Sequence, residues 1–459
     1  MGMPVTFGFR PTEDLEQWLG REYRHAATAM LRSVSACDIV KERPGFGQTV
    51  RPVAGSVVAS PVLAAYDPDP DYFFHWFRDS AIVIDAVRLL FEAEQLGAEA
   101  LTHFADFVRF SLSLRSLDGR TLVAGPDWRR KVTPEFEQYL RGDDLLAVRG
   151  DAVYADTRVN PDGTLDLSRW SRPQHDGAPL RAATVLRWLR TVRNRRANDV
   201  PAELLTDAER LLRIDLALTA ARWREPSVDI WEEELGLHYF TLRVSAAALN
   251  DGADWLRARG EVAEATALRS EAQAIREALD RFWLDEAGHY ASRVMPPGAA
   301  STKLLDIAVI LAAVHAADGG DAHSARDPRI HATLAKLEQL FDRLYPINRG
   351  RPRARAPAMG RYEGDVYYSG GAYYFSTLGA SELCFLAAAA HAPGSEAHAH
   401  WVAHGDQFLE TVRAFTPASG DLSEQFDQRT GAPASAKHLA WSYAAFISCV
   451  TARRAVVSP

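Results

Sequence analysis

The stretch LDIAVILAAVHAA, residues 305–317, is apolar on nearly every side of a helix. A helix that is hydrophobic all round is buried all round. The segments SAIVIDAVRLLF at 80–91 and LAWSYAAFISCV at 439–450 have the same character, whereas EVAEATALRSEAQAIREALDRFW at 261–283 is apolar on one face only. The sequence therefore predicts buried inner helices that alternate along the chain with amphipathic outer helices.

Helical periodicity recurs along the whole chain and predicts twelve helices. They are expected at 12–35, 79–96, 99–116, 177–195, 202–222, 237–259, 261–284, 304–317, 328–344, 371–392, 396–415 and 435–455. The even-numbered helices are the apolar ones and should be the inner ones.

The connections between these helices also alternate in length. Short connections follow the even-numbered helices, and long ones follow the odd-numbered helices, at 36–78, 117–176, 223–236, 285–303, 345–370 and 416–434. In an up-and-down array all the long loops fall at one end, and long loops in a compact domain are usually functional. The pattern predicts an all-α (α/α)6 barrel with its site at the N-termini of the inner helices. An open helical solenoid and a pair of helical bundles are the alternatives.

Length, net charge and cysteine pattern exclude several classes of protein. We expect the 459 residues to form one domain over 1–459. The net charge of −8 argues against a nucleic-acid partner. The cysteines Cys37, Cys384 and Cys449 show no disulfide or metal-binding pattern, so we expect no metal and no cofactor. With no membrane span and no leader segment apparent, a cytoplasmic protein is expected.

Five of the long loops carry aromatic, acidic and arginine residues. Their sequences are DYFFHWFRDS (71–80), RWSRPQHDG (169–177), DIWEEELG (229–236), GRYEGDVYYSGG (360–371) and DLSEQFD (421–427). Aromatic faces stack on sugar rings, and carboxylates and arginines hydrogen-bond the hydroxyls. Each motif alone is more often a solvated helix start or a structural ion pair. Their convergence at one end of the barrel predicts a pocket for a small oligosaccharide.

Cleavage of a glycosidic bond needs two carboxyl groups, one on each side of the bond. The run Glu232–Glu234 beside Trp231 suits the acid, because neighbouring carboxylates and an apolar wall both oppose ionisation. Glu424, on a different loop, is the candidate for the second carboxylate. Inner-helix N-termini would keep such a carboxylate ionised.

The five motifs resemble those of the glucoamylase-type glycoside hydrolases, family 15. DYFFHWFRDS is similar to the family's DYFYTWTRDS, DIWEEELG to its DLWEEVNG and DLSEQFD to its SLSEQYD, in order over about 55–450. The family's catalytic domain is an (α/α)6 barrel. Some members also carry a β-sandwich or a starch-binding domain, and we expect residues 1–459 to form a single catalytic domain without either. The resemblance implies an exo-acting, inverting hydrolase of α-1,4 or α-1,6 glucosides, with Glu232 as general acid and Glu424 as general base. It also implies sugar-binding roles for Tyr72, Trp76, Arg78, Asp79, Trp170, Trp231, Glu233, Arg361, Tyr373 and Trp441.

Three features depart from the family pattern. They are Glu234 in place of a neutral residue, Tyr373 where the family often has tryptophan, and the basic stretch 348–357. We expect all three near the leaving sugar, which leaves linkage and chain length open and favours short substrates such as maltose or isomaltose. A trehalose hydrolase of the same family, a sugar phosphorylase on the same barrel and a non-catalytic sugar-binding protein are the rival functions.

Overall fold

The computed structural model describes residues 13–64, 69–125, 127–194, 200–316, 320 and 322–457. Within these ranges all twelve predicted helices are present, and their ends differ from the prediction by a few residues. They are α1 (Leu15–Leu31), α2 (Phe77–Glu92), α3 (Glu99–Ser113), α6 (Gly177–Asn194), α7 (Ala202–Arg222), α8 (Tyr239–Ala258), α9 (Val262–Asp280), α10 (Ala308–Ala316), α11 (Pro328–Leu344), α12 (Tyr374–Ala388), α13 (Glu396–Phe415) and α14 (Ala440–Val457).

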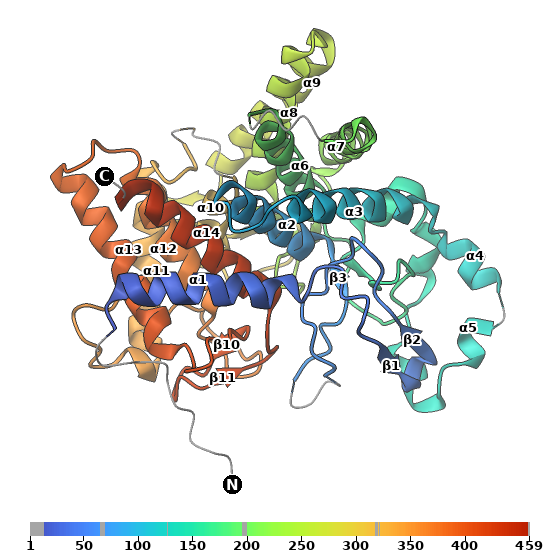
Figure 1. The fold of residues 1–459 in the computed structure, drawn as a ribbon, viewed down its shortest axis with the longest axis horizontal. Coiled ribbons are helices and arrows are strands. Elements are labelled where there is room, and N and C mark those ends of the chain that lie inside the picture. Colours follow the sequence, from blue (N-terminus) through green and yellow to red (C-terminus); the bar gives the residue numbers. More distant parts are fainter. Residues whose placement is uncertain are drawn as a thin grey trace.

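The six inner helices form a closed ring. Helix α2 contacts α6, and contacts then follow from α6 to α8, α10, α12, α14 and back to α2. The outer helices α3, α7, α9, α11 and α13 each contact the inner helix that precedes them in the chain, and α1 packs on α14. Figure 1 shows the blue N-terminal helix α1 alongside the red C-terminal helix α14. Closure of the ring confirms the (α/α)6 barrel and rules out the open solenoid and the two bundles.

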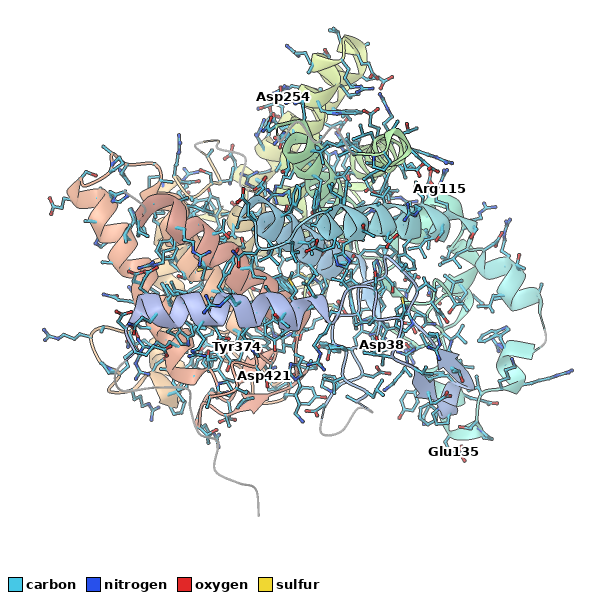
Figure 2. All side chains as sticks on the ribbon, in the orientation of Figure 1. Asp38, Arg115, Glu135, Asp254, Tyr374 and Asp421 are labelled. Atoms are coloured by element: carbon cyan, nitrogen blue, oxygen red, sulfur yellow. The ribbon has the colours of Figure 1, made fainter. Side chains whose placement is uncertain are left out.

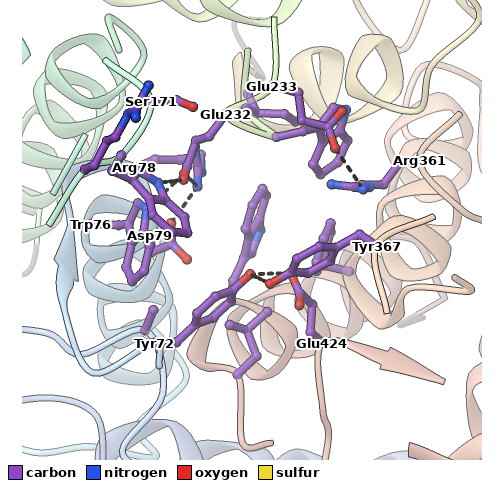
Figure 3. A pocket seen from close by; sticks show the side chains of 18 residues that line it. Tyr72, Trp76, Arg78, Asp79, Ser171, Glu232, Glu233, Arg361, Tyr367 and Glu424 are labelled. Carbon is purple, nitrogen blue, oxygen red and sulfur yellow. Dashed lines mark hydrogen bonds and ion pairs between the residues drawn. The ribbon is translucent and has the colours of Figure 1, made fainter. Parts of the chain in front are cut away.

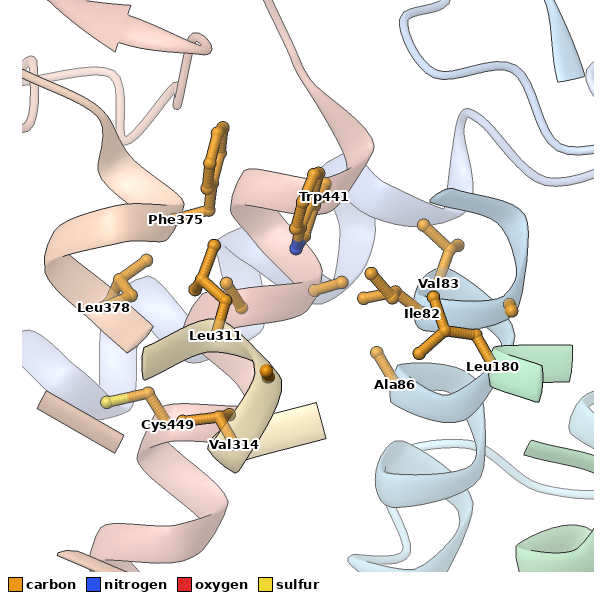
Figure 4. Packing of buried hydrophobic residues seen from close by; sticks show 14 of the residues in the cluster. Ile82, Val83, Ala86, Leu180, Leu311, Val314, Phe375, Leu378, Trp441 and Cys449 are labelled. Carbon is orange, nitrogen blue, oxygen red and sulfur yellow. The ribbon is translucent and has the colours of Figure 1, made fainter. Parts of the chain in front are cut away.

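Burial follows the helix faces that the sequence predicts. Every residue of α12 except Leu386 is buried. The outer helix α9 buries only Ala265, Ala272, Ile275 and Leu279, which lie on one stripe. Figure 4 shows the resulting interior, in which side chains from α2, α6, α10, α12 and α14 pack toward the barrel axis.

The long loops at one end contain short elements that the periodicity does not reveal. The strands pair as β1 (Lys41–Arg43) with β2 (Gln48–Val50), β3 (His75–Trp76) with β4 (Arg158–Val159), β5 (Ser227–Val228) with β6 (Leu235–His238) and on to β9 (Arg293–Val294), β7 (Trp283–Leu284) with β8 (His289–Tyr290), and β10 (Gln425–Phe426) with β11 (Pro433–Ala434), all antiparallel. Strands of two to four residues are too short to show a period of two. The pairs β3–β4 and β6–β9 matter because each ties one long loop to the next above the inner helices.

The second long loop is the most elaborate. It contains the short helices α4 (Gly119–Ala124) and α5 (Asp127–Arg130) and the 3₁₀ turns η2 (Leu114–Ser116), η3 (Pro134–Tyr139), η4 (Asp143–Ala147) and η5 (Gly150–Ala155). A separate small core of buried side chains, among them Leu145, Val153 and Tyr154, stabilises it. Figure 2 shows this part of the chain, with Arg115 and Glu135 labelled, extending to one side of the barrel.

None of the helices in the described ranges combines the length and hydrophobicity needed to span a bilayer.

Candidate active site

A cavity of about 510 Å³ opens among the long loops, at the N-terminal ends of the inner helices. This volume lies in the usual range for small-molecule sites. Figure 3 shows side chains from five loops pointing into it. The predicted site residues that line the cavity are Tyr72, Trp76, Arg78, Asp79, Trp170, Trp231, Glu232, Glu233, Arg361, Glu424 and Trp441.

Two aromatic residues of the lining were not predicted individually. The Tyr367 hydroxyl lies 2.8 Å from that of Tyr72. The ring of Phe375, in the first turn of α12, stacks on Trp441 with centroids 4.4 Å apart and planes 7° apart. Both residues lie close in sequence to the predicted Arg361, and proximity to that motif was the only signal for them. Phe375 also stacks on Trp231 at 6.1 Å, so these rings form a continuous apolar surface beneath the cavity.

Glu232 receives hydrogen bonds from three side chains. Its Oε1 accepts from Trp76 Nε1 at 2.9 Å and from Arg78 Nη2 at 3.0 Å, and its Oε2 accepts from Trp170 Nε1. The backbone of Glu232 has a φ of +64°, which is uncommon outside glycine and concentrates at functional sites. The carboxylate is thus held in one orientation at the edge of the cavity.

The loop around Glu232 is organised by Asp229. Asp229 Oδ1 accepts from the backbone N–H of Trp231 at 2.9 Å and of Glu233 at 3.0 Å. Its other oxygen pairs with buried Arg293 at 2.8 Å. Because short polar side chains can bond the backbone two to four residues on, the aspartate at the start of DIWEEELG defines the turn that presents Glu232.

The side chains of the three glutamates in the run contact different partners. Glu233 lies 3.1 Å from Arg361 and 2.6 Å from Lys303, while Glu234 pairs with Arg293 at 2.8 Å. The mutual repulsion that the sequence predicts for the run is therefore relieved by nearby cations, of which Lys303 lies close to both Glu233 and Glu234. Glu234 does not line the cavity, which corrects its predicted place beside a leaving sugar.

Glu424 lies on the opposite side of the cavity from Glu232 (Figure 3). Its Oε2 accepts from the Ser435 hydroxyl, and the Tyr72 hydroxyl lies 3.4 Å from its Oε1. Burial raises the pKa of Glu424 to about 7, although Ser435 and Arg361 both favour the ionised form. The helix N-termini were predicted to keep this carboxylate ionised, but desolvation has the larger effect on its pKa.

Arg78 occupies the first turn of α2 and faces three carboxylates. It lies 3.2 Å from Asp79 and 3.6 Å from Asp176, in addition to Glu232. Burial raises the pKa of Asp79 to about 6 and that of Asp176 to about 7, and in both cases Arg78 opposes the rise. The Asp79 Oδ2 and Arg78 Nε and Nη1 atoms are buried without a hydrogen-bond partner among the described residues. Unsatisfied polar atoms beside a cavity are suited to bind ligand hydroxyls.

Tyr373 is the one predicted site residue that does not line the cavity. It is fully buried, and its hydroxyl donates to Asp365 Oδ2 at 3.0 Å and accepts from Gln425 Nε2 at 2.8 Å. Asp365 in turn pairs with Arg361 through both carboxylate oxygens. Tyr373 therefore lies behind Arg361 and supports it. The resemblance implies a sugar-binding role for Tyr373, whereas the structure places the residue outside the cavity lining.

The basic stretch 348–357 is likewise absent from the cavity lining. Arg351 pairs with Asp342 of α11, and Arg355 lies over the Phe415 ring at 5.6 Å. These contacts place the stretch on the outer helices, so its predicted position near a leaving sugar is wrong.

Among the residues that the structure describes, no group of three or more His, Cys, Asp or Glu side chains is arranged to hold a metal ion. The chemistry available to the cavity is that of two carboxylates facing one another, the buried Arg78 and Arg361, and aromatic walls. Such a site can move protons at a bond held between the carboxylates.

Comparison with known proteins agrees with this geometry. The family model described as Glycosyl hydrolases family 15 matches residues 45–112 and 158–451. The chain is 26% identical to a glucoamylase of Neurospora crassa over 88% of this chain and 64% of that protein, and 26% identical to a probable glucoamylase of Schizosaccharomyces pombe over 88% and 85%. It thus spans less than two thirds of the length of the first relative.

Solved structures show the same fold. The glucoamylase of Saccharomycopsis fibuligera superposes with a TM-score of 0.79 over 99% of both chains, at 20% identity. That of Hypocrea jecorina superposes with a TM-score of 0.75 over 97% of this chain and 73% of its own, at 23% identity. The match of the family model over most of the chain decides the assignment: the chain belongs to family 15 of the glycosyl hydrolases.

Proposed function

We propose that the protein is an exo-acting, inverting α-glucoside hydrolase that releases β-glucose from the non-reducing end of short α-gluco-oligosaccharides. The observation that carries the proposal is the pair Glu232 and Glu424, which face one cavity from opposite sides and come from separate loops. Two carboxyl groups across a sugar are what glycoside hydrolysis requires.

In the proposed reaction Glu232 is the general acid. Its proton passes to the glycosidic oxygen as the bond from that oxygen to the anomeric carbon breaks. Trp76 and Trp170 hold the carboxyl group in place through their indole N–H groups. Positioning of this kind supports proton transfer in the transition state.

Glu424 is the proposed general base. It removes a proton from the water that attacks the anomeric carbon from the face opposite the leaving group, so the product has inverted configuration. A pKa of about 7 suits a base that works near neutral pH. The nearby hydroxyls of Tyr72 and Tyr367 are suited to hold that water.

Exo-action is supported by the buried charged and aromatic side chains that line part of the cavity. The buried pair Arg78 and Asp79 lies beside the stacked rings of Phe375 and Trp441. We propose that the pair grips hydroxyls of the terminal glucose, so that a chain enters by its end. Glu233, Arg361 and Trp231 would bind the sugars around the cleaved bond.

The substrate is proposed to be a di- or trisaccharide with α-1,4 or α-1,6 linkages. A cavity of about 510 Å³ supports a small sugar. The closed ring of inner helices from α2 to α14, with α1 packed on α14, supports a single catalytic domain. One relative is named an intracellular, sporulation-specific glucoamylase of Saccharomyces cerevisiae, and Cys37, Cys384 and Cys449 are all free thiols, which supports action in the cytoplasm.

A panel of maltose, isomaltose, trehalose and soluble starch, with glucose release as readout, tests the proposal. We expect a disaccharide to exceed starch in kcat/KM by about tenfold, or roughly 1.4 kcal/mol of transition-state binding. Proton NMR of the first product should show β-glucose. The proposal fails if α-glucose appears first or if no α-glucoside is hydrolysed, and starch as the best substrate would contradict the short-sugar assignment.

A further inference from the structure

One segment near the cavity lies between the two regions that the family model matches. Residues 113–157 fall in this gap and contain α4, α5 and the turns η3 to η5. Buried side chains of the segment, among them Leu145 and Tyr154, share a small core with Phe77 of α2 and Phe110 of α3. Beside this shared core, two further connections join the segment to the active site, one through the backbone and one through buried charges.

The backbone junction is at the end of η3. Leu140 pairs with Ser168 in an antiparallel bridge. The N–H of Arg141 donates to Leu167 O at 2.8 Å, and the N–H of Arg169 donates to Tyr139 O at 2.6 Å. Because Arg169 and Trp170 line the cavity, the segment holds the stretch of chain from which Trp170 enters the site.

The second connection is a row of buried ion pairs. It begins in the segment with Arg141 Nη1, 2.7 Å from Asp156 Oδ2, and Asp156 also accepts from Arg172 Nε. Arg172 Nη2 lies 2.8 Å from Asp166 Oδ2, and Arg158 Nε lies 2.9 Å from the same oxygen. The side chains of all five residues are at most 8% exposed. Since a buried charge must be compensated, each member fixes the position of the next.

The row ends on the tryptophans that hold Glu232. The Arg158 guanidinium carbon lies 3.8 Å from the centroid of Trp170 and 4.6 Å from that of Trp76. Cation–π attraction in a desolvated setting favours that arrangement. Both indoles donate to Glu232, so the orientation of Arg158 bears on the carboxylate proposed as general acid.

We propose that Arg141 and Asp156 are positioning residues, through which the segment 113–157 sets the orientation of Trp170 and thereby the acceptance of the leaving sugar. The inference rests on the proposed function of Glu232. Without Arg141, Arg172 is the remaining ion-pair partner of Asp156, and it should shift toward Asp156 and away from Asp166. Arg158, which also pairs with Asp166, is then free to move away from the Trp170 ring. The loss of kcat/KM should be largest for substrates whose leaving group needs protonation and contacts the Trp170 ring.

The test is a double-mutant cycle between Arg141→Gln and Trp170→Phe, measured on maltose or the best disaccharide and on α-glucosyl fluoride. Arg141→Gln should lower kcat/KM for the disaccharide by about tenfold in the wild-type background and by less than about twofold in the Trp170→Phe background. The loss on α-glucosyl fluoride should be less than about threefold, because fluoride needs little protonation. Arg120→Gln is the control, since Arg120 lies in the same segment but pairs only with neighbouring Asp118 among the residues that the structure describes.

Equal losses on both substrates, additive losses with Trp170→Phe, or no loss at all would each overturn the proposal. If Arg141→Gln does not fold, Arg141→Lys, which keeps the charge but loses the forked contact, takes its place in the cycle. A wild-type protein inactive on every α-glucoside would instead refute the proposed function. In that case crystal structures test the row of buried ion pairs. Arg141→Gln should displace the Trp170 ring by about 1 Å, and Arg120→Gln should not.

Discussion

Arg78 Nη2 lies 3.0 Å from Oε1 of Glu232, so the first turn of one inner helix grips a carboxylate presented by a loop 154 positions later in the chain. The same guanidinium faces Asp79 and Asp176. One buried cation therefore serves three carboxylates on this side of the cavity, whereas Arg361 pairs with Glu233. Four predictions follow from this site and its supports, each with its own measurement.

Replacing Glu232 by Gln removes the proposed acid while keeping its shape. We expect kcat on disaccharides to fall by roughly 10²- to 10⁴-fold, the usual contribution of general acid catalysis. Turnover of α-glucosyl fluoride should fall much less, because its leaving group needs little protonation. Steady-state kinetics on the two substrates provide the measurement, and equal losses on both would remove Glu232 from this role.

The acidic limb of the pH–rate profile should report Glu424. A base acts in its ionised form, so kcat/KM should rise with pH through the pKa of about 7 that burial gives this group. The Ser435 hydroxyl donates to the carboxylate and favours the ionised form. Ser435→Ala should therefore move the midpoint to higher pH by about one pH unit.

The control for this shift is Ser419→Ala, an exposed serine on the same loop. Its profile should match that of the wild-type protein. Asp79 and Asp176 also have raised pKa values, so a midpoint that does not respond to Ser435→Ala would assign the limb to one of them.

Substitutions of Asp79 and Arg78 should have different effects. We expect the first to lower kcat/KM and the second to lower the free energy of unfolding as well. Asp79→Asn keeps the shape of the side chain and should lower kcat/KM by about 10²-fold, roughly 3 kcal/mol, with little change in thermal unfolding. Arg78→Ala leaves three buried carboxylates without their shared cation and should cost about 3–5 kcal/mol of unfolding free energy as well. Urea denaturation of both variants measures the difference. An Asp79→Asn protein that unfolds as readily as Arg78→Ala would make the pair a structural ion pair.

Tyr373→Phe tests the supporting role found for this residue. The buried hydroxyl bridges Asp365 and Gln425, and its loss should cost about 1–3 kcal/mol of unfolding free energy. It should also raise KM, because Asp365 aligns Arg361. Tyr345→Phe is the matched control, since its buried hydroxyl donates to the Gly370 carbonyl. The control should lose stability and keep KM, and a KM that rises equally in both would argue against a specific role for Tyr373.

Several features of the fold could be predicted because they depend on local pattern. The apolar faces of 80–91, 305–317 and 439–450 identify inner helices from composition alone, and the order of long and short loops indicates at which end a site lies. The motifs around Arg78, Glu232 and Glu424 could also be located, since each combines aromatic and charged residues beside the start of an inner helix.

The errors have a common cause. Tyr373 was predicted to touch sugar, yet it is enclosed behind Arg361, and Glu234 was predicted to crowd Glu232, yet it turns to Arg293. Arg293 comes from β9, 59 residues beyond Glu234, so the position of that cation could not be known from the run itself. Direction of a loop side chain depends on partners that are distant in sequence.

By itself, then, the sequence determined the twelve helices, their inner or outer position and the loops that carry the chemistry, because helical period and hydrophobic pattern act over neighbouring residues. Tertiary structure alone decided that the ring closes, that Glu424 is buried enough to raise its pKa to about 7, and that a row of charges from Arg141 to Arg158 ends on Trp170. Desolvation and ion pairing depend on what surrounds a group in space, and only the packed barrel brings those surroundings together.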